Sequence, residues 1–171
     1  YPDAFPGGVP AEEMGIQEGD AQAMKAPLDF VGINLYTRSL VKAVEDGNLD
    51  AIDGSPGGGP DGPRTEFGWE VWPDALHDQI MAVTRDYDEN GCSYADGPDA
   101  DGVVNDPRRI EFYRGFLAGV ARAIEKGARV RGYHAWTLMD NFEWAEGYEQ
   151  RFGLVWCDHE TQERIVKASG R

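Results

Sequence analysis

The sequence has few cysteines and no long apolar run. Cys92 and Cys157 are too few for a disulfide framework and lack the paired Cys/His spacing of a zinc site, so we expect two reduced thiols and no metal. No stretch of 18 or more apolar residues occurs, so no membrane-spanning helix is predicted. The first residues also lack the basic and apolar regions of a secretory signal peptide, and we therefore expect a cytoplasmic protein.

Basic residues are also scarce. The chain has 16 Lys and Arg against 31 Asp and Glu, which gives a formal net charge of −15 at pH 7. Binding to nucleic acid or to an anionic membrane depends on clustered Lys and Arg, so neither partner is expected. The acidity indicates a soluble surface rather than a specific acidic site. No nucleotide-binding motif is visible, and no cofactor is expected.

Apolar residues make up 41% of the 171-residue chain, enough for the core of one domain. Residues 30–37 have the composition of a largely buried strand, which a further run over 40–44 extends. Pro73 opens a predicted helix that continues to about Tyr87. A short strand is predicted over 130–136.

A second helix is predicted from residue 107 to Gly127, because Asp106 is suited to the N-cap and Pro107 to the first helical position. Its apolar positions form one stripe at helical spacing. These are Ile110, Tyr113, Phe116, Leu117, Val120 and Ile124.

Two segments are predicted to be irregular. Residues 1–27 are rich in Pro, Gly, Asp and Glu and indicate a connecting segment with short helical turns at 11–14 and 19–24. Residues 46–63 predict a long Gly/Pro-rich surface loop. Along the rest of the chain, the repeated order of strand, loop, helix and strand implies parallel strands joined by crossover helices, as in a doubly wound sheet or a (β/α)8 barrel.

Aromatic and acidic residues gather between Trp136 and Phe152, directly after the predicted strand over 130–136. Sites in parallel α/β folds are built at that end of a strand. An aromatic ring covers the apolar side of a sugar ring, while a carboxylate accepts hydrogen bonds from pairs of hydroxyls. Trp136, Glu143 and Trp144 have the chemistry for these roles, although core packing of the tryptophans and a solvated Glu143 explain the same residues.

Several motifs bear on this choice. The segment Trp136-Thr-Leu-Met-Asp-Asn-Phe-Glu-Trp-Ala-Glu-Gly-Tyr148, followed by Arg151-Phe-Gly-Leu-Val, closely resembles the C-terminal signature of family-1 glycoside hydrolases, the β-glucosidases and their relatives. Asp29-Phe-Val-Gly-Ile-Asn-Leu-Tyr-Thr37 resembles the sixth barrel strand of that family, and Gly68-Trp-Glu-Val-Trp-Pro73 its entry to the next helix. The resemblance implies that residues 1–171 are the C-terminal portion of one catalytic (β/α)8 TIM barrel, covering about its last three strand and helix units.

The resemblance also implies site residues. Glu89, in Glu89-Asn-Gly91, matches the catalytic nucleophile. Asn34 and Tyr36 match a pair near that nucleophile, with the Tyr36 hydroxyl orienting its carboxylate.

Further matches concern the substrate, a β-glucoside or oligosaccharide. Glu143 and Trp144 would hold the hydroxyls of the glycone sugar, and Trp136 would be the platform beneath it. Trp69 is similar to a platform on the aglycone side, a role that the nearby Trp72 could take instead.

Two features depart from the family pattern. The family supplies its acid/base from an Asn-Glu-Pro motif that this chain lacks, so the chain needs the remaining N-terminal part of the barrel as a partner. Residues 84–88 also fall at the end of the predicted helix, which leaves no strand to carry Glu89 across the barrel. We therefore expect either that the sequence omits a strand or that Glu89 lies elsewhere, and we favour omission.

Three functions are compatible with these observations. The first is a retaining β-glycosidase of which this chain is the C-terminal part, inactive by itself. The second is a non-catalytic carbohydrate-binding or structural fragment. The third, an unrelated parallel α/β enzyme, requires the Glu143 carboxylate to point away from any cleft.

Overall fold

The structure is a computed structural model that describes residues 15, 17–24, 27, 29–43, 49–51, 62–83 and 86–171. For residues 21, 24, 41–43, 49–51 and 86–89 it describes the backbone alone. Three parallel strands form the main sheet: β1 (Gly32–Asn34), β4 (Asp86–Gly91) and β5 (Val130–Trp136), in the order β1-β4-β5. The predicted parallel arrangement is confirmed.

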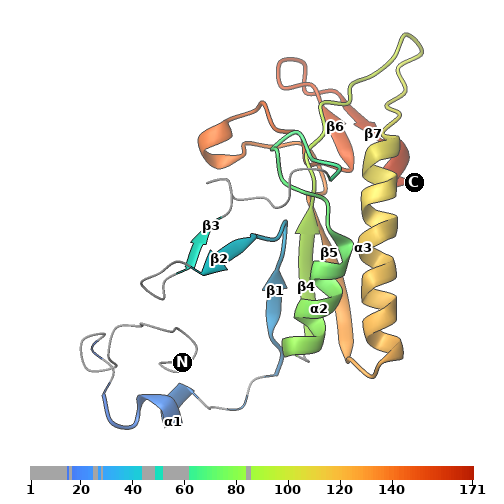
Figure 1. The fold of residues 1–171 in the computed structure, drawn as a ribbon. Helices are drawn as coiled ribbons and strands as arrows, with labels where there is room; N and C mark the ends of the chain where they lie inside the picture. The colour runs from blue at the N-terminus through green and yellow to red at the C-terminus, as the bar shows by residue number, and fades with distance from the viewer. Residues whose placement is uncertain are drawn as a thin grey trace.

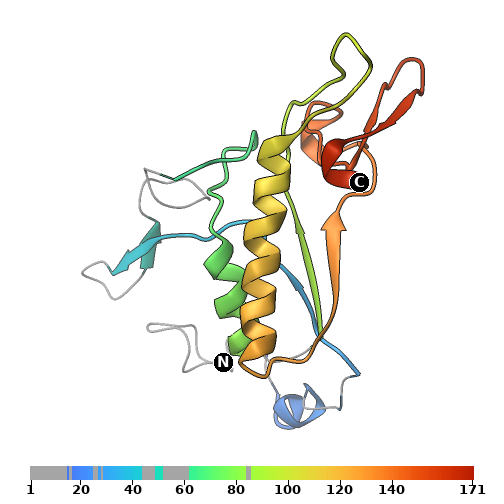
Figure 2. The same ribbon diagram turned by 90° about the vertical axis from the view of Figure 1, so that its right-hand side faces the viewer.

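Both long helices lie on one side of this sheet, as Figure 2 shows. Helix α2 (Pro73–Val83) connects β1 to β4, and α3 (Pro107–Glu125) connects β4 to β5. A doubly wound sheet places helices on both faces, whereas a barrel keeps them all outside. The sequential strand order and the one-sided helices therefore favour the barrel among the two predicted architectures.

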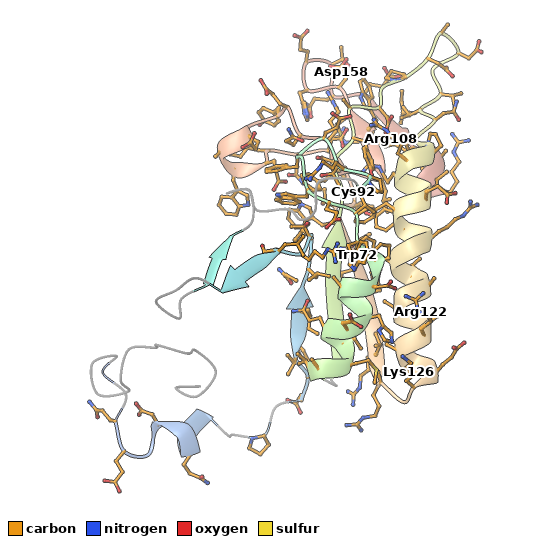
Figure 3. The ribbon with its side chains drawn as sticks, in the orientation of Figure 1. Trp72, Cys92, Arg108, Arg122, Lys126 and Asp158 are labelled. Atoms are coloured by element: carbon orange, nitrogen blue, oxygen red, sulfur yellow. The ribbon has the colours of Figure 1, made fainter. Side chains whose placement is uncertain are left out.

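The core lies between the helices and the sheet. Leu76 and Ile80 of α2 pack against a row of α3 side chains, and Cys92, labelled in Figure 3, and Tyr94 close the upper end. The two helices approach closely at Gly119, where a Cβ would lie 3.0 Å from the Pro73 carbonyl oxygen. The buried α3 residues that contribute to this core are Phe112, Tyr113, Phe116, Val120 and Ala123.

Smaller elements surround the sheet (Figure 1). Helix α1 (Asp20–Met24) confirms the helical turn predicted at 19–24, while residues 11–14 lie outside the described residues. Strands β2 (Val41–Ala43) and β3 (Leu49–Ala51) form one antiparallel pair, and β6 (Val155–Cys157) and β7 (Arg164–Val166) form another. Two short 3-10 helices, η3 (Trp144–Glu146) and η4 (Ala168–Gly170), complete the fold.

The most important correction concerns β4. The predicted helix to Tyr87 is wrong, because α2 ends at Val83 and a six-residue strand begins at Asp86. At about 3.3 Å per residue, this strand has the length that a barrel crossing needs. The prediction that no residues remain for that strand is therefore also wrong: pairing with β1 and β5 on both sides overrides the weak strand propensity of these polar residues.

Other predictions also need correction. The strand after Phe30 is not largely buried, because only Ile33 of β1 is enclosed while the helices cover one face of the sheet. Residues 46–63 are not all loop, because β3 lies within them and pairs with β2.

The apolar stripe of α3 is displaced around the helix. Leu117 and Ile124 are 46% and 49% exposed, because α3 packs against α2 and the sheet through the neighbouring positions. Asp106 lies at the predicted N-cap position, but its side chain makes no cap bond, because its carboxylate pairs with Arg109 and with Ser169 instead.

Candidate active site

The carboxyl ends of the three parallel strands meet at one edge of the sheet, the upper end of the strands in Figure 1. Asn34 of β1 is the register partner of Glu89 on β4, and Glu89 is in turn the partner of His134 on β5. Trp136 ends β5 beside Gly91. The fold thus brings Asn34, Glu89 and Trp136, far apart in sequence, onto adjacent strands.

Gly91 is required where β4 and β5 approach most closely. A Cβ at Gly91 would lie 2.2 Å from the Trp136 carbonyl oxygen and 2.8 Å from the Trp136 Cβ. The adjacent Asn90 is fully buried, donates from its amide to the Leu35 carbonyl and accepts a hydrogen bond of 3.1 Å from the Tyr133 hydroxyl. Asn90 and Gly91 therefore fix the backbone on which Glu89 lies.

Trp136 and Glu143 are brought into contact by the loop after β5. The indole Nε1 of Trp136 donates to Oε2 of Glu143 over 3.3 Å. Within the loop, the Glu143 amide donates to the Gly147 carbonyl over 2.6 Å, which folds the chain back on itself. Within the described residues, no side chain or amide bonds to the other carboxylate oxygen of half-buried Glu143, and Trp144 is 81% exposed beside it. This arrangement provides a carboxylate next to aromatic surfaces.

Tyr36 and Trp69 belong to an aromatic cluster that extends the same edge. The two rings lie 5.4 Å apart, and Phe67 lies 4.4 Å from Trp69. Phe152 contacts all three rings at centroid distances of 6.0 to 6.5 Å. Phe67 and Phe152 were missed as site residues, although Phe152 lies inside the Arg151-Phe-Gly motif. A contact between Tyr36 and Glu89 stays a prediction, because the Glu89 side chain lies outside the described part.

Trp72 lies in different surroundings from Trp69. The Arg38 guanidinium stacks over its ring at 3.6 Å and also forms a two-pronged ion pair with buried Glu70, at 2.8 and 3.2 Å. Trp72 therefore packs against the Arg38–Glu70 ion pair, which connects the segment before α2 to the chain after β1. Only Trp69 of the two tryptophans joins the aromatic cluster.

A buried ionic network, which the sequence analysis missed, supports the base of the loop that carries Glu143. Oδ1 of Asp140 accepts hydrogen bonds from Lys167 Nζ at 3.0 Å and from the Gly153 amide at 2.9 Å. Oδ2 accepts them from Arg151 Nη1 at 2.9 Å and from the Cys157 amide at 3.4 Å. Four donors thus fix Asp140 three residues before Glu143.

A second buried pair joins this network to α3. Arg109 Nε donates to Asp106 at 2.9 Å, and its Nη groups donate to the carbonyls of Cys92, Arg151 and Phe152. The Ser169 amide bonds to the other oxygen of Asp106 at 2.9 Å. Arg109 therefore ties the segment after β4 to the segment after the Glu143 loop.

Burial changes the titration of this region. Loss of hydration, with the nearby charge of Arg109, lowers the pKa of Lys167. Loss of hydration raises the pKa of the Cys92 thiol to about 12, although Arg109 acts in the opposite direction. Both cysteines are free, as predicted.

The described residues contain no group of three or more His, Cys, Asp or Glu side chains that could hold a metal ion. Among them, no helix is both long and apolar enough to cross a membrane.

Comparison with known proteins matches this geometry to a family. The family model described as Glycosyl hydrolase family 1 matches residues 4–171, which is nearly the whole chain. The chain belongs to glycosyl hydrolase family 1. The resemblance drawn from the sequence motifs is therefore confirmed.

Curated members of the family are similar over most of the chain. The chain is 40% identical over 174 residues to the bifunctional β-D-glucosidase/β-D-fucosidase of Bifidobacterium breve, covering 90% of this chain and 38% of that enzyme. It is 38% identical over 186 residues to the β-glucosidase of Agrobacterium sp., covering 100% of this chain and 40% of that enzyme. Since that alignment exceeds 171 positions, the Agrobacterium enzyme has residues within the aligned region that this chain lacks.

Solved structures of the family are similar to the fold. The family 1 β-glucosidase from Thermotoga maritima superposes with a TM-score of 0.80 at 37% identity, covering 88% of this chain and 34% of that one. The same enzyme in complex with castanospermine gives a TM-score of 0.82 at 36% identity, covering 94% and 37%. This family 1 chain thus spans between a third and two fifths of the length of these relatives and is part of a TIM barrel, as predicted.

Proposed function

We propose that this chain is the nucleophile-bearing and glycone-binding part of a retaining β-glycosidase that hydrolyses terminal β-D-glucosyl or related residues. The observation that carries the proposal is the edge where β1, β4 and β5 end together. Glu89 lies on the middle strand there, between Asn34 and His134, and the Trp136–Glu143 pair follows the last strand.

In the proposed reaction, the Glu89 carboxylate attacks the anomeric carbon and forms a glycosyl ester, with inversion at that carbon. A carboxylic acid from the N-terminal part of the barrel protonates the departing oxygen. The resulting carboxylate then removes a proton from water, which displaces Glu89 and restores the original configuration. In this reaction, the Tyr36 hydroxyl orients the nucleophile.

The substrate contacts follow from the same edge. The Glu143 carboxylate would accept hydrogen bonds from two sugar hydroxyls, because one of its oxygens bonds to the Trp136 indole and the other is available. Trp136 and Trp144 would cover the apolar side of the glycone ring, and Trp69 the aglycone. The partner is the rest of the barrel, and a cytoplasmic location stays a prediction.

A chimera tests this function directly. Residues 1–171 would replace the corresponding C-terminal part of the T. maritima β-glucosidase. We expect hydrolysis of an aryl β-glucoside by a chimera and a loss of at least about 1,000-fold on Glu89→Gln, because covalent catalysis requires the carboxylate.

The unfused chain is the control and should show no turnover, since it lacks the acid/base. The proposal fails if the folded chimera does not hydrolyse the glucoside, or if Glu89→Gln retains full activity. Glucoside binding by a chimera without turnover would instead support a carbohydrate-binding fragment.

A further inference from the structure

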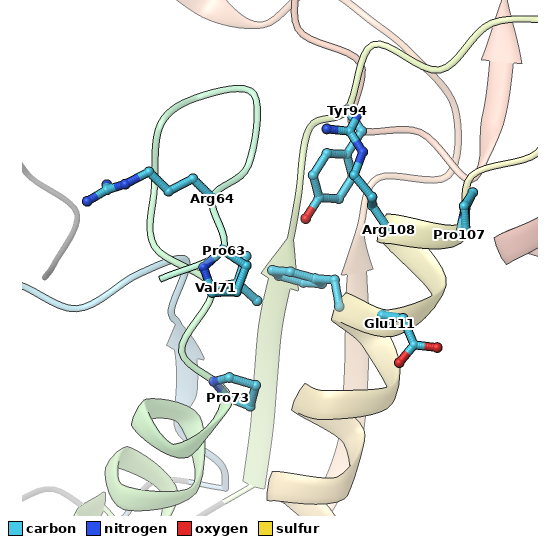
Figure 4. A pocket seen from close by; sticks show the side chains of 9 residues that line it. Pro63, Arg64, Val71, Pro73, Tyr94, Pro107, Arg108 and Glu111 are labelled. Atoms are coloured by element: carbon cyan, nitrogen blue, oxygen red, sulfur yellow. The ribbon is translucent and has the colours of Figure 1, made fainter. Parts of the chain in front are cut away.

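A pocket of about 440 Å³ lies on the helix side of the sheet, between α2, α3 and the loop of residues 62–71. Figure 4 shows it from close by. None of the proposed sugar-binding residues lines it. The lining residues of its apolar wall are Pro63, Val71, Pro73, Tyr94, Pro107 and Phe112.

Size and lining suit a small organic molecule. Ligand pockets in proteins are usually about 300 to 1,000 Å³, mostly apolar, with few polar groups. An apolar cavity of about 150 Å³ already accepts benzene. A pocket of about 440 Å³ therefore has room for a two-ring compound.

The polar group in this wall is the Tyr94 hydroxyl. Tyr94 is only 3% exposed, and its hydroxyl has no hydrogen-bond partner within the part of the chain that the structure describes. Figure 4 shows the oxygen directed toward the side formed by Pro63 and Val71. Burial raises the pKa of Tyr94 to about 12, so the hydroxyl keeps its proton at neutral pH and can donate it. A ligand oxygen inside the pocket could therefore accept a hydrogen bond from this hydroxyl.

The charges at the rim have partners already. Arg108 stacks over the Tyr94 ring at 4.5 Å and forms ion pairs with Glu66 at 3.0 Å and Asp96 at 3.8 Å. Glu111 pairs with Arg114 at 2.6 Å. The Arg64 side chain points away from α3 in Figure 4. This balance favours a neutral ligand over an ionic one.

We propose that the pocket binds a neutral, planar aromatic alcohol of about two rings, whose oxygen accepts a hydrogen bond from Tyr94 and whose rings pack between Val71 and Phe112. The site is separate from the sugar edge, and the proposal does not rest on any hydrolytic activity.

The test uses the 171-residue chain and 6-fluoro-2-naphthol, followed by ¹⁹F NMR. We expect a saturable shift with a dissociation constant of about 1 mM or tighter. Tyr94→Phe keeps the ring but removes the donor, so binding should weaken by about 2- to 10-fold. Val71→Trp fills the pocket and should weaken binding by at least about 10-fold.

Tyr148→Phe is the matched control, because Tyr148 is exposed outside this pocket, and its binding should equal that of the wild type. Circular dichroism would establish that each variant is folded; if Val71→Trp is not, Tyr94→Phe decides. The proposal is overturned if folded wild type gives no saturable shift or if Tyr94→Phe binds as tightly as wild type. Equal binding of fully saturated decahydro-2-naphthol, in competition, would overturn the aromatic assignment.

Discussion

Asp140 holds the loop that carries Glu143 through contacts with residues that follow it in the chain. Lys167, Arg151 and two backbone amides all donate to its carboxylate, and Lys167 is fully buried. Removing one member of a buried ion pair usually costs about 3 to 5 kcal/mol, because the remaining charge lacks compensation. The free-energy cost of removing Lys167 should be smaller than this. Arg151 still pairs with Asp140, and burial of the Lys167 ammonium, which has lost its hydration, is itself unfavourable.

We therefore expect Lys167→Met to lower the free energy of unfolding by about 2 to 3 kcal/mol, as measured by urea denaturation. Lys126→Met, at an exposed position after α3, is the control and should change it by less than about 0.5 kcal/mol. Equal unfolding midpoints for the two variants would contradict a structural role for the Lys167–Asp140 pair.

Charged residues are where sequence-based prediction failed at this scale. Asp106 occupies the predicted N-cap position but makes no side-chain cap bond, and Arg109, Asp140 and Lys167 received no role, because charged side chains are usually exposed. Their burial depends on partners distant in sequence, such as Asp140 with Lys167. The spacing of Asp106 and Arg109, one helical turn apart, was the available signal for one of these pairs.

At the scale of elements, apolar periodicity predicted well where one element buries one face. Strand β5 has the predicted bounds, and α3 begins at the predicted Pro107. Strand β4 could not be predicted in this way, because Asp86–Gly91 lacks a strand pattern and forms only between two partners. Likewise, the motifs indicated Trp136 and Glu143 as site residues, but they did not predict the hydrogen bond between these two side chains.

The contact between β4 and β5 makes a specific prediction for Gly91. A Cβ there meets the Trp136 backbone at 2.2 Å, and neither strand can yield without breaking pairing. We expect Gly91→Ala to destabilise the chain by about 3 kcal/mol in urea denaturation.

Gly32→Ala, on β1, is the matched control, since a Cβ at Gly32 meets nothing within 4 Å. Its cost should be below about 1 kcal/mol. If both variants unfold at the same urea concentration, that result would contradict the close approach of β4 and β5 at Gly91.

The whole molecule has the form of a barrel segment with open sides. Strands β1 and β5 each pair with one strand only, within the described residues, and the sheet face away from α2 and α3 carries no helix. Side chains such as Leu117, Ile124 and Leu138 are also exposed. The remaining strands and helices of a family 1 barrel would cover these surfaces, in agreement with the share of the relatives that this chain spans.

Global stability should fall at alkaline pH. The Cys92 thiol ionises near 9.0 when unfolded, but burial raises its folded pKa to about 12. The free energy of unfolding that the protonated thiol contributes is thus fully present below about pH 9 and is lost as pH rises toward 12. Lys167 acts oppositely, because its lowered pKa makes the folded chain release that proton first.

Cys92→Ala isolates the thiol. Between pH 9 and 10, the free energy of unfolding of the wild type should fall by about 1 kcal/mol more than that of the variant, as measured by urea denaturation at each pH. Parallel slopes would show that Cys92 does not titrate in this way.

The two buried ion pairs also set an order of events during synthesis. The loop with Glu143 leaves the ribosome before Lys167 and Ser169, the residues that bind Asp140 and Asp106. Chains emerge from the N-terminus at about 5 to 20 residues per second, so this loop spends seconds without its supports. We therefore expect the Glu143 carboxylate to reach its final place only after Lys167 and Ser169 have emerged.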